Sequence, residues 1–351
     1  MGDSKAVFLE RGMMEDRIDA QTLGEHVCVA WRRWHSEADH VLEFSESPDG
    51  GATWSKPVVV AGPGRPIVEM SFAWPPEGPR LAWLEGDGAG QRMAVSKRPT
   101  GSRAWSPPAA VASARAVAGQ GKGVDNPNGA IDYAMTAHGF RWAVPPGDLS
   151  GTPLERAPGT RGAPKPYRVL TTSSGKLALL CSSPAPGKPR AAYLAPVDES
   201  GQVLRKRLRP ISDPRHDVVT VGAIGRGPTV VVAEEVSEQI WVQASSDAGA
   251  TFTAAALVFP DQRETRKFGL ADSGGVFHIA VLQLGVMQVT GRLLLASSVD
   301  GRSWAPWASM RLPLHSEREV ALAASGPRLI AFISDQIDGL MTLTLPLPGS
   351  R

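Results

Sequence analysis

Three segments of this chain share one pattern: a serine, an aspartate two residues later, then a glycine and a closing aromatic residue. They are Ser47–Trp54, Ser245–Phe252 and, one residue shorter, Ser298–Trp304. The glycine supplies the positive φ of a tight turn, and the aspartate accepts hydrogen bonds from the N–H groups of that turn. The aromatic residue packs onto apolar surface. Because a recurring hairpin sets the period of a repeat fold, this pattern limits the possible architectures more than any other feature.

The period is about 50 residues, which is the length of one four-stranded propeller blade. Turn signals of the same kind, several of them eroded, recur along the chain at this spacing. The sequence therefore predicts an all-β fold, a single β-propeller domain over residues 1–351. The repeated turns of successive blades are expected near Trp54, Trp105, Thr152, Leu204, Phe252 and Trp304.

The strands after the last of these turns decide the number of blades. Three predicted strands near residues 319–324, 328–334 and 340–347 lack a fourth partner, while Ala6–Glu10 precedes the first blade and has no blade of its own. Pairing this run with those strands removes exposed sheet edges. We therefore predict seven blades, the last one completed by the N-terminal strand. Six blades with an insertion is the alternative, because the segment 114–166 is irregular.

Composition and charge argue against several classes of function. The chain has 351 residues, of which 42% are hydrophobic, and a net charge of +2. So small a charge gives no reason to expect a nucleic-acid partner. No segment has the apolar length of a membrane span, and the N-terminus lacks the features of a signal peptide. We therefore expect a cytoplasmic protein with no membrane partner, or a secreted or periplasmic one if a signal peptide has been removed.

The sequence also lacks the common cofactor and metal motifs. It has no P-loop, Gly-x-Gly-x-x-Gly fingerprint or Cys-x-x-Cys pair, so no nucleotide or redox cofactor is expected. The run His35–His40 holds two histidines and two acids, but their spacing is too short for a zinc site, and no metal is expected. Cys28 and Cys181 each lie in an apolar strand-like run. This predicts two buried thiols and no disulfide.

The repeated pattern resembles the Asp-box, or BNR repeat, of sialidase-like β-propellers. The resemblance implies that the boxes lie on turns at the end of the propeller away from the active site, where their role is structural. The residues to which it gives that role are Ser47, Asp49, Gly51 and Trp54, then Ser245, Asp247, Gly249 and Phe252, then Ser298, Asp300 and Trp304.

An arginine recurs at the beginning of the first strand of six predicted blades. In a propeller this strand lines the central channel, and its beginning lies at the end opposite the Asp-boxes. The rigid fork of N–H donors in arginine suits carboxylate, phosphate or sulfate. The pattern therefore predicts an anion-binding mouth, and pairing of each arginine with a neighbouring acid is the alternative. The arginines concerned are Arg17, Arg65, Arg168, Arg215, Arg266 and Arg318.

The resemblance extends to the order of residues in the first blade. Sialidases begin it with an Arg-Ile-Pro motif, followed by further arginines and an acid/base aspartate before the first box. Here Arg17-Ile18-Asp19, Arg32 and Asp39 stand in that order, with aspartate in place of proline. By carry-over, Arg17 looks like the first member of a carboxylate-binding arginine triad and Arg32 like a further ligand-binding arginine. Asp39 looks like the acid/base.

The remaining catalytic groups of the family are matched less well. A sialidase uses a tyrosine nucleophile near the C-terminal end of the propeller, activated by a glutamate. Glu235, or Glu234 beside it, is the candidate for that glutamate, and Arg292 is the candidate for a later arginine of the triad. The tyrosines of this chain, none of them in its last two-fifths, are Tyr133, Tyr167 and Tyr193.

Three functions remain open on this basis. The first is a binding module that recognises an anionic or glycan ligand, or a protein partner, through an arginine-rich face. The second is a sialidase-like exo-glycoside hydrolase, and the third is an inert protein-interaction scaffold. The order of residues in the first blade favours hydrolysis, while the missing C-terminal tyrosine favours binding. We expect binding to be the main function.

Overall fold

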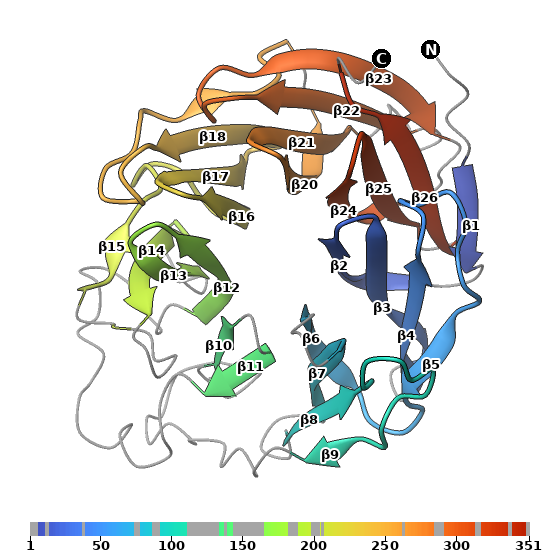
Figure 1. The fold of residues 1–351 in the computed structure, drawn as a ribbon. Coiled ribbons are helices and arrows are strands. Elements are labelled where there is room, and N and C mark those ends of the chain that lie inside the picture. The colour runs from blue at the N-terminus through green and yellow to red at the C-terminus, as the bar shows by residue number, and fades with distance from the viewer. Residues whose placement is uncertain are drawn as a thin grey trace.

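The strands form a ring of antiparallel sheets around a central axis (Figure 1). The computed structural model describes residues 6–10, 14–36, 39–73, 78–85, 92–110, 133–136, 139–142, 165–181, 189–197, 204, 207–261, 264–283, 291–312, 317–335 and 339–348. Every element in this part of the chain is a β-strand. No helix described there has the length and apolar character needed to cross a membrane.

Six of the sheets described have four strands and one has two. All use consecutive strands except the last, which recruits the N-terminal strand. In order along the chain the sheets are β2 (Met14–Leu23), β3 (His26–Ser36), β4 (Asp39–Ser47) and β5 (Val58–Ala61); β6 (Ile67–Ala73), β7 (Arg80–Glu85), β8 (Arg92–Lys97) and β9 (Ala109–Ala110); β10 (Tyr133–Thr136) and β11 (Gly139–Trp142); β12 (Lys165–Thr172), β13 (Gly175–Cys181), β14 (Ala192–Val197) and β15 (Arg209–Pro210); β16 (Val218–Arg226), β17 (Thr229–Val236), β18 (Gln239–Ser245) and β19 (Ala256–Leu257); β20 (Thr265–Ser273), β21 (Val276–Gln283), β22 (Gly291–Ser298) and β23 (Ala305–Leu312); and β24 (Glu317–Ser325), β25 (Arg328–Asp335) and β26 (Gly339–Pro346) with β1 (Ala6–Glu10).

Neighbouring sheets contact one another around the ring, mostly through their first strands. β2 contacts β6, β6 contacts β11, β10 contacts β12, and β12, β16, β20 and β24 follow one another until β24 contacts β2. This arrangement confirms the predicted β-propeller. Most of the segment 114–166, with the turn expected near Thr152, lies outside the described residues. The count of seven complete blades and the assignment of 1–351 to one domain therefore stay predictions.

The N-terminal strand pairs with the C-terminal sheet, as predicted. β1 runs antiparallel to β26, with Ala6 opposite Leu343. Leu9 is buried in a cluster with Leu340 and with apolar residues of the first sheet. The strand therefore covers the edge of β26, which would otherwise be open to pairing with another chain.

The apolar core lies between neighbouring sheets. Because side chains alternate along a strand, β3 packs one face on the second sheet and the other on the last. Cys28 belongs to a cluster with Phe72 of β6, whereas Trp31 belongs to a cluster with Phe332 of β25. The run 27–31 is completely buried as a result. The buried thiol predicted for Cys28 is confirmed, and the side chain of Cys181 lies outside the described residues.

Each Asp-box forms a turn, as predicted, and that turn follows the third strand of its sheet. In the first box, Ser47 Oγ donates to Asp49 Oδ1 at 2.8 Å, and Gly51 N donates to Ser47 Oγ at 2.7 Å. Thr53 donates its N–H and its hydroxyl to the carboxylate at 2.8 and 2.7 Å. The same four bonds recur around Asp247 at 2.6 to 2.8 Å. Chiefly through the bonds from Thr53, the pKa of Asp49 is lowered to about 2.

The boxes also join each sheet to the preceding one. The ring of Trp54 lies 5.5 Å from that of Phe332 in the last sheet, at an interplanar angle of 82°. In the third box, a Cβ added at Gly301 would lie only 2.5 Å from Val231 Cγ2 in the fifth sheet. Glycine is therefore required there by close packing as well as by its φ of 72°.

Candidate functional site

The inner strands share an irregularity close to where each begins. In six sheets the register between the first and second strands shifts at this point, in five of them by one extra residue. Such a bulge leaves a residue unpaired in the ladder and re-aims its side chain. The extra residues are Val68, Tyr167, Val219, Arg266 and Arg318, and in β2 the shift spans residues 15–17.

Three of these bulges carry an arginine, and they lie on successive strands of the ring. Arg266, Arg318 and Arg17 stand in β20, β24 and β2, which contact one another in that order. Gly269 allows the backbones of β20 and β24 to approach closely, because a Cβ there would lie 3.1 Å from Ala321 Cα. Gly269 follows Arg266 by three residues, as Ala321 follows Arg318. The two arginines therefore stand at the same level.

A hydrogen bond fixes β2 against β24 at that level. Ile18 N donates to Glu319 Oε2 at 3.1 Å, and these two residues directly follow Arg17 and Arg318. Since the third strand of each sheet runs parallel to the first, the beginnings of the inner strands lie opposite the Asp-boxes. We call this the arginine end of the ring. The side chains of the three arginines are outside the described part of the structure, so the site rests on backbone placement.

Val219 shows what a bulge does to a side chain at the arginine end. It is the extra residue of β16, and 45% of its surface is exposed. Val218 before it and Val221 after it are buried. The bulge therefore turns Val219 out of the packed wall between sheets, although the valines on either side of it in the strand are buried.

The other predicted arginines have different surroundings. Arg215, just before β16, is exposed and paired with Asp213 through bonds of 2.9 and 2.6 Å, which matches the paired alternative. Arg65 is exposed just before β6. Arg168 directly follows the bulge residue of β12, and its side chain lies outside the described residues.

Two arginines assigned to ligand binding lie on outer strands of their sheets, Arg32 on β3 and Arg292 on β22. Arg32 is buried, and its guanidinium donates to the carbonyl of Ile67 in the next sheet, so it joins two sheets. Arg292 lies on β22, the third strand of its sheet, opposite Gln283. Neither belongs to the group formed by Arg17, Arg266 and Arg318.

The candidate acids occupy two kinds of position. Asp39 is the first residue of β4, and its side chain lies outside the described residues. Glu235 is buried on β17, opposite Thr220. Glu234 beside it is 1% exposed, and its Oε2 has no hydrogen-bond partner among the described residues. Burial, followed by the charge of Asp213, raises the pKa of Glu234 to about 7.

Tyr167 also lies in a bulge at the arginine end, a position that the sequence analysis did not single out. It is the extra residue of β12, at the position that Arg266 holds in β20. The family resemblance implied a tyrosine in the last part of the chain, whereas this one lies at the arginine end in the fourth sheet. The other two tyrosines lie elsewhere, Tyr133 on β10 and Tyr193 buried on β14.

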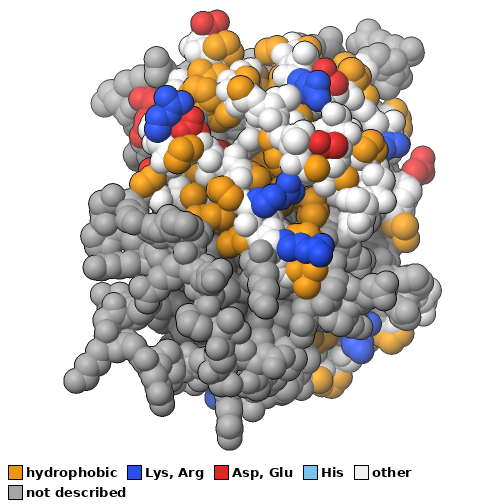
Figure 2. Space-filling view, turned by 90° about the vertical axis from the view of Figure 1, so that its left-hand side faces the viewer, with side chains coloured by type: hydrophobic (Ala, Val, Ile, Leu, Met, Phe, Trp, Pro, Cys, Tyr) orange, Lys and Arg blue, Asp and Glu red, His pale blue; other side chains and the backbone are white. Residues whose placement is uncertain are grey.

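On the outer side of the ring near β15, the basic side chains are scattered. Figure 2 shows the described Lys and Arg side chains of this side in small separate groups, with acidic and apolar side chains between them. Nucleic-acid-binding faces have basic residues clustered into a patch or stripe. The described surface on this side therefore gives no support to a nucleic-acid interface.

Comparisons with known structures agree with this architecture. The sialidase of Trypanosoma rangeli in complex with sialic acid matches with a TM-score of 0.59 and 10% identity, over 99% of this chain and 59% of that chain. The endosialidase of phage phi92 matches with a TM-score of 0.59 and 10% identity, over 98% and 69%. The NanB sialidase of Streptococcus pneumoniae matches with a TM-score of 0.55 and 10% identity, over 96% and 69%.

This chain thus spans only 59% of the Trypanosoma rangeli structure that it matches. No protein-family model matches the sequence, and no curated protein matches it either. At identities this low, the likeness concerns the fold alone. The chain is an Asp-box β-propeller with the fold of the sialidases.

Proposed function

We propose that this protein binds a small acidic ligand, with an acidic sugar as the best fit, at the arginine end of the ring. The observation that carries the proposal is the equivalent placement of Arg17, Arg266 and Arg318 in the bulges of three adjacent strands. Guanidinium groups bind carboxylates through paired N–H···O bonds. Three of them at one level provide enough donors for both oxygens of a carboxylate.

Two further observations support an acidic sugar over other anions. The Trypanosoma rangeli sialidase, which shares this fold, was solved with sialic acid bound. Sialic acid carries one carboxylate on a polar ring. In addition, Arg17 and Asp39 stand in the order that resembles the first blade of sialidases.

The test is calorimetric titration of sialic acid into the wild-type chain and three single variants. Arg17→Ala, Arg266→Ala and Arg318→Ala should each weaken binding roughly 10- to 100-fold, because a hydrogen bond to a charged group contributes about 1.5–3 kcal/mol. The matched control is Arg302→Ala. Arg302 lies in the third Asp-box, at the other end of the ring, where it donates to Ser246 Oγ at 3.0 Å.

The methyl ester of sialic acid provides the second arm of this test. It keeps the sugar ring and removes the charge, so it should bind much more weakly than the free acid. Equal affinity of the ester, or unchanged binding in all three inner-strand variants, contradicts the proposal. So does a complete absence of binding, which instead favours a protein partner or an inert scaffold.

A second candidate function is hydrolysis of a sialoside, favoured by the position of Tyr167. This residue brings a nucleophile of the type that sialidases use to the end of the ring where Arg17, Arg266 and Arg318 stand. The test is release of a fluorescent leaving group from a synthetic sialoside. Under this candidate, Tyr167→Phe abolishes turnover and leaves sialic acid affinity within about twofold of wild type. No turnover by the wild-type chain removes this candidate and leaves the binding proposal in place.

A further inference from the structure

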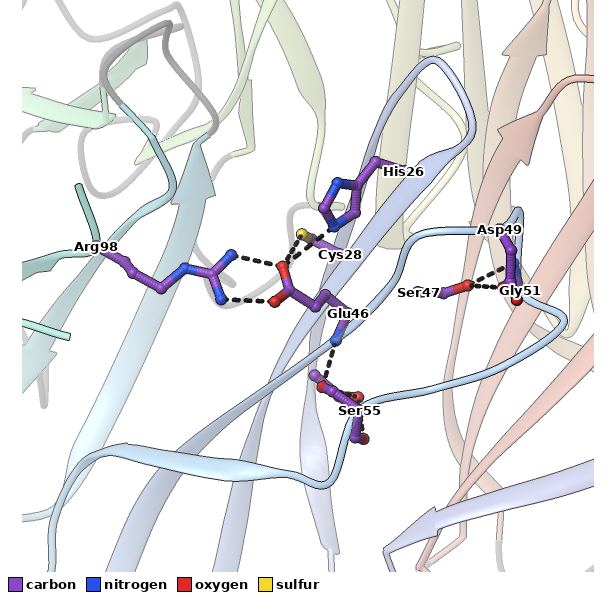
Figure 3. Close-up of polar contacts among 9 residues, drawn as sticks. His26, Cys28, Glu46, Ser47, Asp49, Gly51, Ser55 and Arg98 are labelled. Carbon is purple, nitrogen blue, oxygen red and sulfur yellow. Dashed lines mark hydrogen bonds and ion pairs between the residues drawn. The ribbon is translucent and has the colours of Figure 1, made fainter. Parts of the chain in front are cut away.

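Three side chains of types that bind metals meet on one face of the first sheet. His26 and Cys28 are two residues apart on β3, so they leave the strand on the same face. Glu46 on β4 stands opposite Cys28 in the register. Figure 3 shows the three side chains converging on one carboxylate oxygen, with Arg98 reaching the same carboxylate from the second sheet.

The distances within this cluster are close to those of a metal site. From Glu46 Oε2, His26 Nε2 lies at 3.1 Å and Cys28 Sγ at 4.0 Å. All three ligand atoms lie within 4.8 Å of one another. In a tetrahedral zinc site with bonds of about 2.0–2.3 Å, ligand atoms stand roughly 3.3–3.7 Å apart. Side-chain shifts of about an ångström therefore suffice to place one ion between them.

We infer that His26, Cys28 and Glu46 form a binding site for a divalent transition-metal cation, with Zn²⁺ as the best fit, at the Asp-box end of the ring. Thiolate, imidazole and carboxylate are the three ligand types that zinc uses in proteins. The harder cations Mg²⁺ and Ca²⁺ take oxygen ligands instead. Three protein ligands leave the fourth tetrahedral position to water. The side chain of His26 is 37% exposed, which gives an ion access from solvent.

A neighbouring arginine holds the Glu46 carboxylate in place, as residues around metal ligands commonly do. Arg98 Nη1 donates to Oε1, the other carboxylate oxygen, at 2.8 Å. Its guanidinium is held in turn over the ring of Phe44, 4.9 Å from the centroid. A metal at Oε2 replaces the bond from Arg98 Nη2 and leaves the bond from Nη1 to orient the carboxylate. Partners of this kind are a regular feature of metal ligands.

Metal binding changes the protonation of Cys28. Burial, with a further contribution from the charge of Glu46, raises the pKa of this thiol well above its usual value, so the metal-free cluster holds a neutral thiol. A bound Zn²⁺ converts it to the thiolate, and the proton passes to solvent. The ion then has two negative ligands and one neutral one.

The test is a titration of Co²⁺ into the full chain, without a polyhistidine tag and with a non-chelating reductant. Co²⁺ takes the place of Zn²⁺ in such sites and reports its ligands by absorption. We expect one equivalent to produce a near-ultraviolet band from thiolate-to-metal charge transfer together with the strong visible bands of tetrahedral Co²⁺. Zn²⁺ added afterwards should abolish both.

The chain offers a matched control because it has only two cysteines. Cys28→Ser should remove the near-ultraviolet band, and Cys181→Ser should leave it unchanged. His26→Gln alters a partly exposed side chain, so the fold is retained, and it should weaken Co²⁺ binding by more than about 10-fold. The inference is overturned by a wild-type chain that shows no such band, by a band that survives Cys28→Ser, or by unchanged affinity in His26→Gln.

Discussion

At the scale of single residues, the buried carboxyl group of Glu234 makes the free energy of unfolding depend on pH. Its pKa is raised by burial from 4.5 to about 7. The unfolded chain therefore loses this proton at a lower pH than the folded chain does. The contribution of Glu234 to stability is complete below about pH 4.5 and is lost as the pH rises through 7. The loss amounts to about 3.5 kcal/mol, taking about 1.4 kcal/mol per pKa unit.

We therefore predict that Glu234→Gln flattens the dependence of stability on pH. The fall in melting temperature between pH 5 and pH 8 should be smaller in the variant than in the wild type, because the amide does not ionise. Thermal unfolding at both pH values measures this. Glu25→Gln, a change on the exposed surface, is the control and should follow the wild type. An equally steep fall in Glu234→Gln contradicts the assignment.

At the scale of elements, the third Asp-box packs closely against the preceding sheet, and glycine substitutions test the energetic importance of this contact. Gly301 and Gly227 both have positive φ, 72° and 53°. A Cβ at Gly301 meets Val231 Cγ2 at 2.5 Å, whereas a Cβ at Gly227 meets nothing within 4 Å. We predict that Gly227→Ala costs about 1–2 kcal/mol from backbone strain alone. Gly301→Ala should cost about 2–5 kcal/mol, because overpacking adds to that strain.

Urea denaturation of the two variants compares these costs directly. Equal losses of unfolding free energy in Gly301→Ala and Gly227→Ala would show that close packing of the box on the preceding sheet adds no cost. A larger loss in Gly301→Ala isolates the contact with Val231, since both changes add the same methyl group to a turn.

The sequence predicted the strands and turns better than it predicted single site residues or contacts between sheets. Strands and box turns could be predicted because alternation and turn residues act locally. The bulges could not, since one extra residue such as Arg266 or Arg318 leaves the apolar pattern of its strand intact. The contacts of Arg32 with Ile67, 35 residues apart, and of Arg98 with Glu46, 52 residues apart, depend on how sheets pack. The pairing of Arg215 with Asp213 is local, two residues apart, and the sequence did offer such pairing as an alternative to anion binding.

At the scale of the whole molecule, β1 covers the outer edge of the last sheet. We predict that deleting residues 1–10 lowers the melting temperature and causes association that increases with protein concentration, because the uncovered edge of β26 can pair with another chain. Light scattering and thermal unfolding over a range of concentrations measure both effects. Deleting 349–351, beyond the last strand, is the control. A monomeric variant with the wild-type melting temperature would contradict the role given to β1.

The same pairing has a consequence for how the protein is made. Thr342 Oγ1 donates to the carbonyl of Val7 at 3.3 Å, across 335 residues of chain. At a ribosomal rate of about 5–20 residues per second, the first strand is therefore synthesised roughly 20–70 s before its partner. During that time the nascent chain carries an apolar strand, β1, whose pairing partner β26 has not yet been synthesised. A chaperone that holds the N-terminal segment would act in this interval.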